Sequence, residues 1–277
     1  DAELIVCGGA ESMSLVKKMS FPEEYWEEEL AERYPEAYMG PGLTAERVAR
    51  AYGVTRLAME RMAVESHRRA HAAQTAGLFR EEIVPIRART EDGGEILVTE
   101  DQGIRPETTL DTLSALKPCF QADGLVTAAT SSQMSDGASF VVLMSRGKAE
   151  RLGVRPVARL AGFAVAGCPA EIMGIGPIHA VPKVMAQTGL TLEQMDTIEL
   201  NEAFAAQAIP CIRELGMDPA KVNPNGGALA LGHPLGATGS VLTCKALSQL
   251  RRTGGRYALV TMCVGGGMGA AGIFELL

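Results

Sequence analysis

The feature that most constrains this chain is a glycine-rich stretch at residues 223–239, Asn-Pro-Asn-Gly-Gly-Ala-Leu-Ala-Leu-Gly-His-Pro-Leu-Gly-Ala-Thr-Gly. It holds one histidine, His233, and five glycines. Glycines at this density allow the backbone to adopt positive φ angles and to approach a ligand closely. Residues 241–250 then repeat apolar side chains with the helical period, which predicts a helix beginning at the Gly-His-Pro step and ending at Gly254. His233 is therefore expected at a helix start, either as a functional side chain or as a capping or core histidine.

A second glycine-rich motif, Cys-Val-Gly-Gly-Gly-Met-Gly at residues 263–269, lies between the strand-like runs 257–262 and 272–277. Cys263 is thus expected where a strand meets a glycine turn. The glycine spacing imitates a dinucleotide-binding fingerprint, but that motif requires a following helix and an acidic residue about twenty positions later. Because a strand-like run follows instead, a Rossmann-type site is rejected.

A third motif, Asn-Glu-Ala-Phe-Ala-Ala-Gln at residues 201–207, comes directly after the strand-like run 197–200. The amide side chain of Asn201 is therefore expected at a corner between a strand and a helix. Such corners are where α/β sheets place their chemistry. Asn201 is a candidate site residue for this reason.

Composition narrows the class of protein. The 277 residues, 47% of them hydrophobic, suffice for a sizeable core, and no apolar run approaches the roughly twenty residues that a membrane span requires. The net charge of −7 argues against general nucleic-acid binding. Six cysteines without a C-x-x-C pair indicate a reducing compartment. His67 and His71 have metal-ligand spacing, but the arginines between them and the lack of a matching acid favour an exposed helical face.

The two ends of the chain share one pattern. A strand-like run at 3–7 ends in Gly8-Gly9 and has a partner-like run at 137–144, just as strand, glycine turn and strand follow one another at 257–277. The first copy is split by an insertion of about 125 residues. We infer two related halves, and we expect the strand at 3–7 to pair with residues 139–144 in one sheet.

Other predicted elements follow from local pattern. In the insertion they are an acidic run, two capped helices and a β-like stretch: 23–29 as a solvated helical face, 44–51 capped by Thr44, 56–75 capped by Thr55, and 82–98. After residue 154 strands alternate with helices: strands at 158–165 and 197–200, helices at 182–188 and 203–215. This alternation predicts an α/β fold with a sheet covered by helices.

Three motifs together resemble the C-terminal signatures of thiolases: Asn-Glu-Ala-Phe-Ala at 201–205, the stretch 223–239, and Cys-Val-Gly-Gly-Gly-Met-Gly-Ala-Ala at 263–271. Their order and separations match too, and the resemblance extends to Gly-Gly-Ala-Glu-Ser-Met-Ser at 8–14. The degradative 3-ketoacyl-CoA thiolases of fatty-acid β-oxidation are the most similar. The resemblance implies a thiolase-like α/β fold, in which two related βαβαββ halves form five α-β-α-β-α layers with an inserted loop domain.

The resemblance also divides the chain. Residues 1–11 and 134–153 would be the remnant of an N-terminal half, 12–133 the inserted loop domain that binds coenzyme A, and 154–277 the C-terminal half. The N-terminal half is expected to be incomplete by about a hundred residues, because no counterpart of residues 155–256 precedes residue 1.

Site roles come from the same resemblance. A degradative thiolase is an acyltransferase that cleaves a 3-ketoacyl-CoA with a second coenzyme A, passing the shortened acyl group through a cysteine and releasing acetyl-CoA. By motif match, His233 would activate the nucleophilic sulfur and Cys263 would be the second acid/base. His233, with a water held by Asn201, would stabilise the enolate or thioester oxygen, and the Gly265 N–H would serve the acyl-enzyme oxyanion.

The ligands implied are substrates. Acyl-CoA and coenzyme A would bind with Arg105 at the nucleotide phosphates and Ser132 at the pantetheine; a surface arginine and a turn serine are the plain alternatives. No metal and no other cofactor is expected. The family further implies a homodimer or homotetramer, and the absence of a visible targeting segment predicts a cytoplasmic enzyme.

The nucleophilic cysteine of the family lies about twenty residues before the motif at 8–14, ahead of residue 1, and none of the six cysteines matches it. Residues 1–277 alone are therefore expected to be inactive. One alternative is a ketoacyl-synthase-like condensing enzyme, which shares the Gly-His-x-x-Gly-Ala-x-Gly loop but would have histidine or asparagine in place of Cys263. The other is a non-catalytic CoA-binding or assembly protein. In an active enzyme, His233 and Cys263 are predicted to meet at the floor of one pocket.

Overall fold

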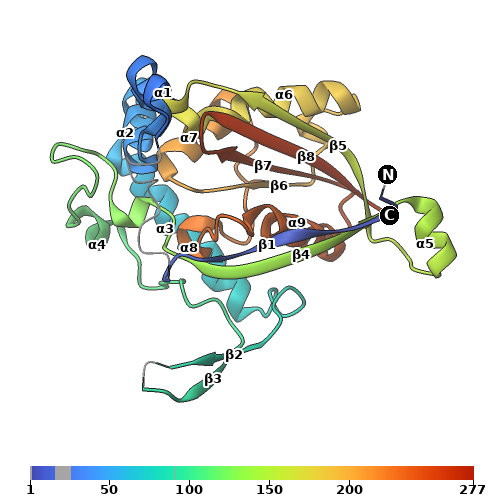
Figure 1. Ribbon diagram of the computed structural model, residues 1–277. Coiled ribbons are helices and arrows are strands. Elements are labelled where there is room, and N and C mark those ends of the chain that lie inside the picture. Colours follow the sequence, from blue (N-terminus) through green and yellow to red (C-terminus); the bar gives the residue numbers. More distant parts are fainter. Residues whose placement is uncertain (1, 16–25, 91) are drawn as a thin grey trace.

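The C-terminal part of the chain forms a four-stranded sheet (Figure 1). The computed structural model describes residues 2–15, 26–90 and 92–277. The strands lie in the order β5 (Ala158–Gly167), β8 (Met268–Leu276), β7 (Tyr257–Val264) and β6 (Thr197–Leu200). β8 pairs antiparallel with both β5 and β7, whereas β6 pairs parallel with β7. All four residues of β6 are buried, as expected for a parallel strand covered on both faces.

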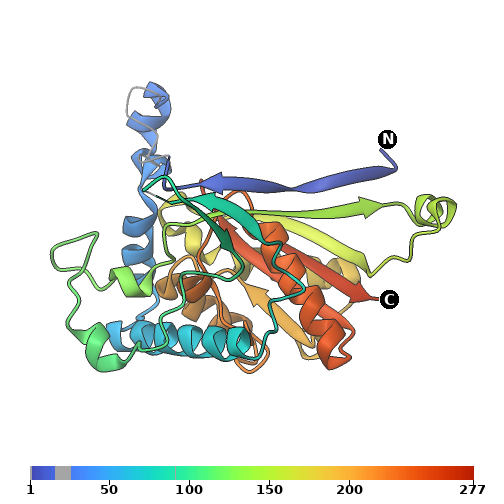
Figure 2. The same ribbon diagram turned by 90° about the horizontal axis from the view of Figure 1, so that it is seen from below.

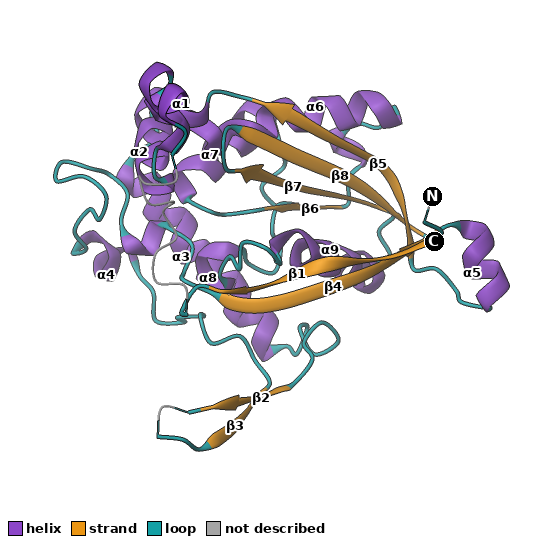
Figure 3. Cartoon of the chain, in the orientation of Figure 1, coloured by secondary structure: helices purple, strands orange, loops and turns teal. Residues whose placement is uncertain are grey.

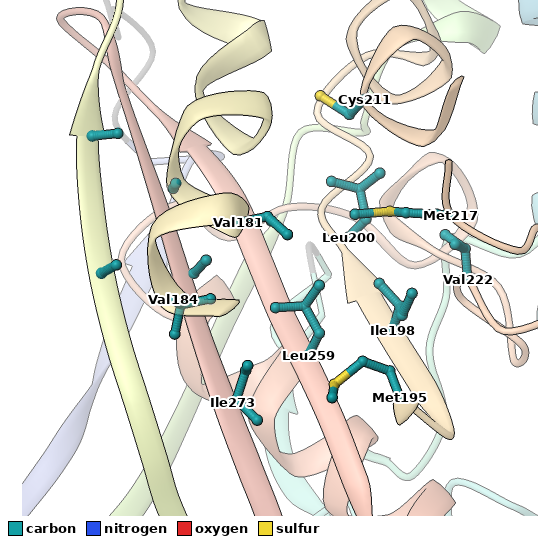
Figure 4. Packing of buried hydrophobic residues seen from close by; sticks show 14 of the residues in the cluster. Val181, Val184, Met195, Ile198, Leu200, Cys211, Met217, Val222, Leu259 and Ile273 are labelled. Atoms are coloured by element: carbon teal, nitrogen blue, oxygen red, sulfur yellow. The ribbon is translucent and has the colours of Figure 1, made fainter. Parts of the chain in front are cut away.

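Helices cover both faces of this sheet. On one face, α6 (Gly176–Thr188) and α7 (Ala205–Leu215) pack over a core that includes Val181, Val184, Ile198, Leu200, Leu259 and Ile273 (Figure 4). On the other, Leu242, Ala246 and Leu250 of α9 (Thr238–Thr253) pack against Ala258 and Val260. Burying a side chain such as Leu or Ile contributes about 1.5–3 kcal/mol. These apolar contacts fix the strand ends that carry the candidate site.

The first strand of the chain belongs to a second sheet, which has two strands. β1 (Leu4–Ser12) pairs antiparallel with β4 (Asp136–Met144), with Leu4 opposite Met144 and Cys7 opposite Val141. The predicted pairing of 3–7 with 139–144 is thus confirmed. However, β1 continues through Gly8-Gly9, where it was expected to end. The glycines permit close approach, because a Cβ on Gly8 would lie 2.2 Å from the Ser139 carbonyl oxygen.

The two sheets enclose α9. The Ser240 hydroxyl on α9 donates to the Ser139 carbonyl of β4 at 2.8 Å, while the opposite side of the helix faces the four-stranded sheet (Figures 1 and 2). The described residues therefore form four layers, α-β-α-β, of the five predicted. This arrangement and the order β5, α6, β6, α7, β7, β8 confirm the expected fold class.

The remaining elements lie between β1 and β4 or in connections. They are α1 (Glu28–Arg33), η2 (Pro35–Tyr38), α2 (Pro41–Ala51), α3 (Arg56–Thr75), β2 (Ile86–Arg89), β3 (Glu95–Val98), α4 (Leu110–Ser114), η3 (Ala128–Thr130), α5 (Arg146–Leu152), η4 (Ala170–Ile175), η5 (Leu192–Gln194) and α8 (Ala228–Leu231). Figure 3 shows α2, α3 and α7 gathered at the end of the sheets opposite the two chain termini. β2 and β3 form a hairpin that projects from the rest of the molecule. In the part of the chain that the structure describes, no helix has the length and apolar character to cross a membrane.

Element boundaries test the sequence predictions. α3 has the predicted bounds, and the Thr55 hydroxyl caps it by accepting the Ala58 N–H at 3.2 Å. α2 begins at Pro41 instead of Thr44, because a proline with its φ near −65° suits the first turn; the Thr44 hydroxyl donates to the Pro41 carbonyl at 2.8 Å. α6 likewise begins six residues earlier than predicted, with Pro182 inside it.

The acidic run at 23–29 is described only from residue 26. Residues 23–25 lie outside the described part. Glu27 caps α1, its carboxylate accepting the Leu30 N–H at 2.6 Å, and Glu28 and Glu29 are exposed in the first turn. Carboxylates favour this end of a helix because they complement the helix dipole.

Candidate active site

His233 lies in the connection between two helices. The short helix α8 ends at Leu231, and its C-cap Gly232 turns the chain sharply with a φ of 88°. The His233 N–H then donates to the Ser135 hydroxyl at 2.9 Å. α9 begins only at Thr238, so the prediction that it starts at the Gly-His-Pro step is wrong by several residues. A turn intervenes, in which the Ala237 N–H donates to the Pro234 carbonyl at 2.9 Å. The imidazole is thus held by a helix on each side.

The hydrogen bonds of His233 favour one tautomer. The Thr238 hydroxyl donates its single hydrogen to the Pro234 carbonyl at 2.9 Å, so it accepts from His233 Nδ1–H, 2.6 Å away. Nε2 therefore carries the lone pair, and the Asn201 amide nitrogen lies 3.3 Å from it. Burial lowers the pKa of His233 to about 4. The ring is neutral at physiological pH, with an acceptor at Nε2.

Asn201 connects His233 to the strand of Cys263. It is the first residue after β6, and its N–H donates to the Thr261 carbonyl on β7 at 3.0 Å. The side chain is fully buried, and Oδ1 has no hydrogen-bond partner among the described residues. One residue thus fixes the distance between the imidazole and β7.

Cys263 lies near the end of β7, opposite Gly269 of β8. Its side chain is half-buried, and burial raises the pKa of its thiol to about 12. Cys263 is therefore a thiol at neutral pH, a form that can donate a proton. That its side chain shares one pocket with His233 stays a prediction.

The turn between β7 and β8 depends on glycine. Gly267 has a φ of 88°, and a Cβ there would lie 2.3 Å from the Cys168 carbonyl oxygen. Gly265 in the same turn is exposed, and apart from its chain neighbours no described residue has an atom within 4 Å of where its Cβ would lie. The backbone around Gly265 is consequently open to an approaching ligand.

A backbone hydrogen bond ties Ser132 to the segment that follows Asn201, whereas Arg105 is bonded to α3. The Ser132 N–H donates to the Ala203 carbonyl at 2.9 Å, two residues beyond Asn201. Arg105 is exposed, and its backbone N–H donates to His67 Nδ1 at 3.1 Å. His67 is buried, so the prediction of an exposed helical face is wrong for it and holds only for His71. The error arises because the segment of Arg105 packs over α3.

Comparison with known proteins identifies the family. A family model described as the N-terminal domain of thiolase matches residues 1–147, and one described as the C-terminal domain of thiolase matches residues 154–276. The chain belongs to the thiolase family. It is 50% identical to a 3-ketoacyl-CoA thiolase of Bacillus subtilis over 98% of this chain and 71% of that protein. It is 43% identical to a beta-ketothiolase of Cupriavidus necator, covering 72% of that protein.

Solved thiolase structures share the fold. The human mitochondrial 3-ketoacyl-CoA thiolase superposes with a TM-score of 0.90 at 38% identity, over all of this chain and 72% of that one. The dimeric peroxisomal thiolase of Saccharomyces cerevisiae gives a TM-score of 0.91 at 40% identity, over 99% of this chain and 69% of that one. The family and fold expected from the three motifs are confirmed.

Sequence reasoning missed several residues around the candidate site. Thr238 sets the tautomer of His233, and Ser135 holds its backbone. Glu202, beside Asn201, is buried and accepts hydrogen bonds from three residues in two other segments. Thr238 and Glu202 lie inside the motifs that the sequence singles out, so their position was a usable signal. No local signal marked Ser135, because its hydrogen bond with His233 spans almost a hundred residues of sequence.

Proposed function

We propose that this thiolase acts as an acetyl-CoA C-acyltransferase, cleaving 3-ketoacyl-CoA with coenzyme A to acetyl-CoA and a shortened acyl-CoA. The observation that best supports this activity is the neutral imidazole of His233. Thr238 holds its Nδ1, and the lone pair of Nε2 faces Asn201. A base with this orientation can take the proton of a thiol. Relatives named 3-ketoacyl-CoA thiolase favour this activity over a condensing or non-catalytic role.

In the first half-reaction, a cysteine thiol gives its proton to His233 Nε2 and its sulfur attacks the 3-keto carbon. The bond between C2 and C3 then breaks, its electron pair forms the acetyl-CoA enolate, and the Cys263 thiol protonates C2. The raised pKa of Cys263 keeps its thiol protonated at neutral pH, so the proton that this step needs is present. None of the six cysteines in residues 1–277 is proposed as the nucleophile, because none follows the family pattern.

In the second half-reaction, the Cys263 thiolate takes the proton of the incoming coenzyme A. The new thiolate attacks the acyl-enzyme carbonyl carbon, and the catalytic sulfur leaves and takes back its proton from His233 Nε2. We assign the Gly265 N–H to the oxyanion of this step, and His233 with an Asn201-bound water to the enolate oxygen of the first. A positioned acid or base contributes about 10²- to 10⁴-fold, and one oxyanion donor about 10²- to 10³-fold.

We propose that the chain divides into 1–11 with 134–153, an inserted domain 12–133 that binds coenzyme A, and 154–277. We propose that Arg105 contacts the nucleotide phosphates of coenzyme A and that Ser132 contacts its pantetheine. Exposure of Arg105 and the link from Ser132 to the strand end of Asn201 support these roles. The chemistry uses only thiol, imidazole and amide groups, so no metal or cofactor is proposed.

We further propose a cytoplasmic homo-oligomer, a dimer or a tetramer. All six cysteines are free thiols, which fits a reducing compartment. The yeast relative is described as dimeric. Light scattering coupled to size-exclusion chromatography tests the assembly.

The test of the activity is thiolysis of acetoacetyl-CoA by the full-length protein. His233→Ala and Cys263→Ser should each lower kcat by at least about a hundredfold. A control substitution at the exposed His71 should leave kcat unchanged. Normal turnover by both site variants would refute the proposed roles.

A further inference from the structure

Glu202 is a buried carboxylate beside the candidate catalytic amide. It follows Asn201 directly and is only 3% exposed. Its Oε1 accepts from the Asn223 amide nitrogen at 2.8 Å. Its Oε2 accepts from the Ser66 hydroxyl at 2.7 Å and from the Leu229 N–H at 3.2 Å. Two segments far apart in sequence, α3 and residues 223–229, therefore meet at one side chain.

Each of these segments supports the loop of His233. Leu229 lies in α8, the helix that ends at Leu231 and leads through Gly232 into His233. The Ser66 hydroxyl also accepts the Gly227 N–H at 3.0 Å, which fixes the residue before α8. Asn223 has a positive φ of 44°, which costs conformational energy for a residue other than glycine. Its side chain holds that conformation by bonding the backbone of Leu200.

Close packing against Gly227 restricts the position of the Glu202 carboxylate. A Cβ on Gly227 would lie 2.2 Å from Glu202 Cδ, so the carboxylate fits only because residue 227 is glycine. On its other side, Glu202 borders a cavity of about 520 Å³ between α3 and α7, whose lining includes neither His233 nor Cys263. Glu202 thus contacts the support of the site and lies away from the reacting atoms.

We propose that Glu202 is a positioning residue for catalysis, a role that rests on the proposed function. Asn201 and Glu202 are consecutive residues after β6. Asn201 contacts the imidazole itself, and Glu202 binds α8, the helix that precedes the imidazole. This double attachment keeps His233 Nε2 within reach of Asn201. Misplacing a catalytic group by about 1 Å can cost roughly a hundredfold in rate.

Glu202→Gln is the decisive substitution. A glutamine cannot accept all three hydrogen bonds, because its amide nitrogen would face either the Asn223 amide or the Leu229 N–H. Flipping Asn223 would not help, since both ends of its side chain are bonded to Leu200. α8 should therefore loosen while the fold persists.

Glu46 offers a matched control. It is a buried carboxylate, 0% exposed, and it accepts the backbone N–H groups of Leu125 and Val126 at 2.9 Å, outside the His233 loop. Glu46→Gln should lower stability without changing kcat. The full-length protein is assayed for thiolysis at a temperature where both variants are folded, with hydrogen exchange measured over the peptide 223–239.

Glu202→Gln should lower kcat on the order of 10- to 100-fold with little change in KM, and should speed exchange in residues 227–233. An unchanged kcat, or an equal loss of kcat in Glu46→Gln, overturns the proposal. If the wild type shows no thiolysis, the proposed function fails, but hydrogen exchange still tests the positioning role. Unaltered protection of residues 227–233 in Glu202→Gln overturns that role by itself.

Discussion

Replacing Glu199 by glutamine should change how stability depends on pH. Glu199 lies in β6, is fully buried, and neither of its carboxylate oxygens has a hydrogen-bond partner among the described residues. Burial raises its pKa from 4.5 to about 8, although the positive charge of Lys245 opposes the shift. The carboxyl group is therefore protonated in the folded protein at neutral pH and ionised in the unfolded chain.

The size of the effect on the free energy of unfolding follows from this difference in pKa between the folded and unfolded states. Between pH 4.5 and about 8, folding takes up a proton at Glu199, so the free energy of unfolding falls by about 1.4 kcal/mol for each pH unit. At pH 7 the accumulated cost is about 3 kcal/mol, and above the folded pKa it stops growing. Glu199→Gln removes this titration. Relative to wild type, the variant should gain stability steadily from pH 5 to 8.

Urea unfolding at pH 5, 6, 7 and 8 measures this gain, since the difference between the two curves cancels the other titrating groups. Glu275→Gln is the control. Paired with Arg256 and Arg159, Glu275 has a lowered pKa and is ionised in both states above pH 5, so its variant should differ from wild type by a constant amount. Parallel curves for wild type and Glu199→Gln would refute the assignment of a protonated Glu199.

Three further predictions concern the site. Thr238→Val removes the acceptor of His233 Nδ1–H and should lower kcat about tenfold or more in the thiolysis assay, whereas a normal kcat would show that the tautomer needs no support. Arg105→Ala should raise the KM for coenzyme A with kcat unchanged, and an unaltered KM would remove Arg105 from the nucleotide site. Gly267→Ala should cost about 1–3 kcal/mol in thermal unfolding because of its φ of 88° and the Cys168 carbonyl; an unshifted Tm would contradict that strain.

Local sequence patterns predicted those elements whose signals are local. α3 has its predicted bounds because Thr55 caps a long periodic run. α8 escaped prediction because four residues are too few to show a helical period. The start of α2 was misplaced because Thr44 resembles a cap, whereas the Gly40-Pro41 step provides the true start. Short-range signals thus fix element existence better than element ends.

Residues that act across long sequence separations could not be predicted in this way. The motifs led to His233, Asn201 and Cys263 because each combines a reactive side chain with glycines or a strand end. Burial of His67 was missed because it depends on packing of the Arg105 segment over α3, which no local pattern reports. The same holds for the contact of Glu202 with Ser66, since the two residues are 136 positions apart.

The most direct test of the proposed chemistry is exchange of the C2 protons of acetyl-CoA with solvent deuterium, catalysed by the full-length protein and followed by mass spectrometry. Cys263 is assigned to move the proton at C2, and His233 to activate the nucleophilic sulfur. Cys263→Ser should therefore slow exchange by at least about a hundredfold while the enzyme still becomes acylated by acyl-CoA, at a cysteine other than the six described here. Exchange at the wild-type rate in Cys263→Ser, or an acyl group mapped to one of these six cysteines, would contradict the account.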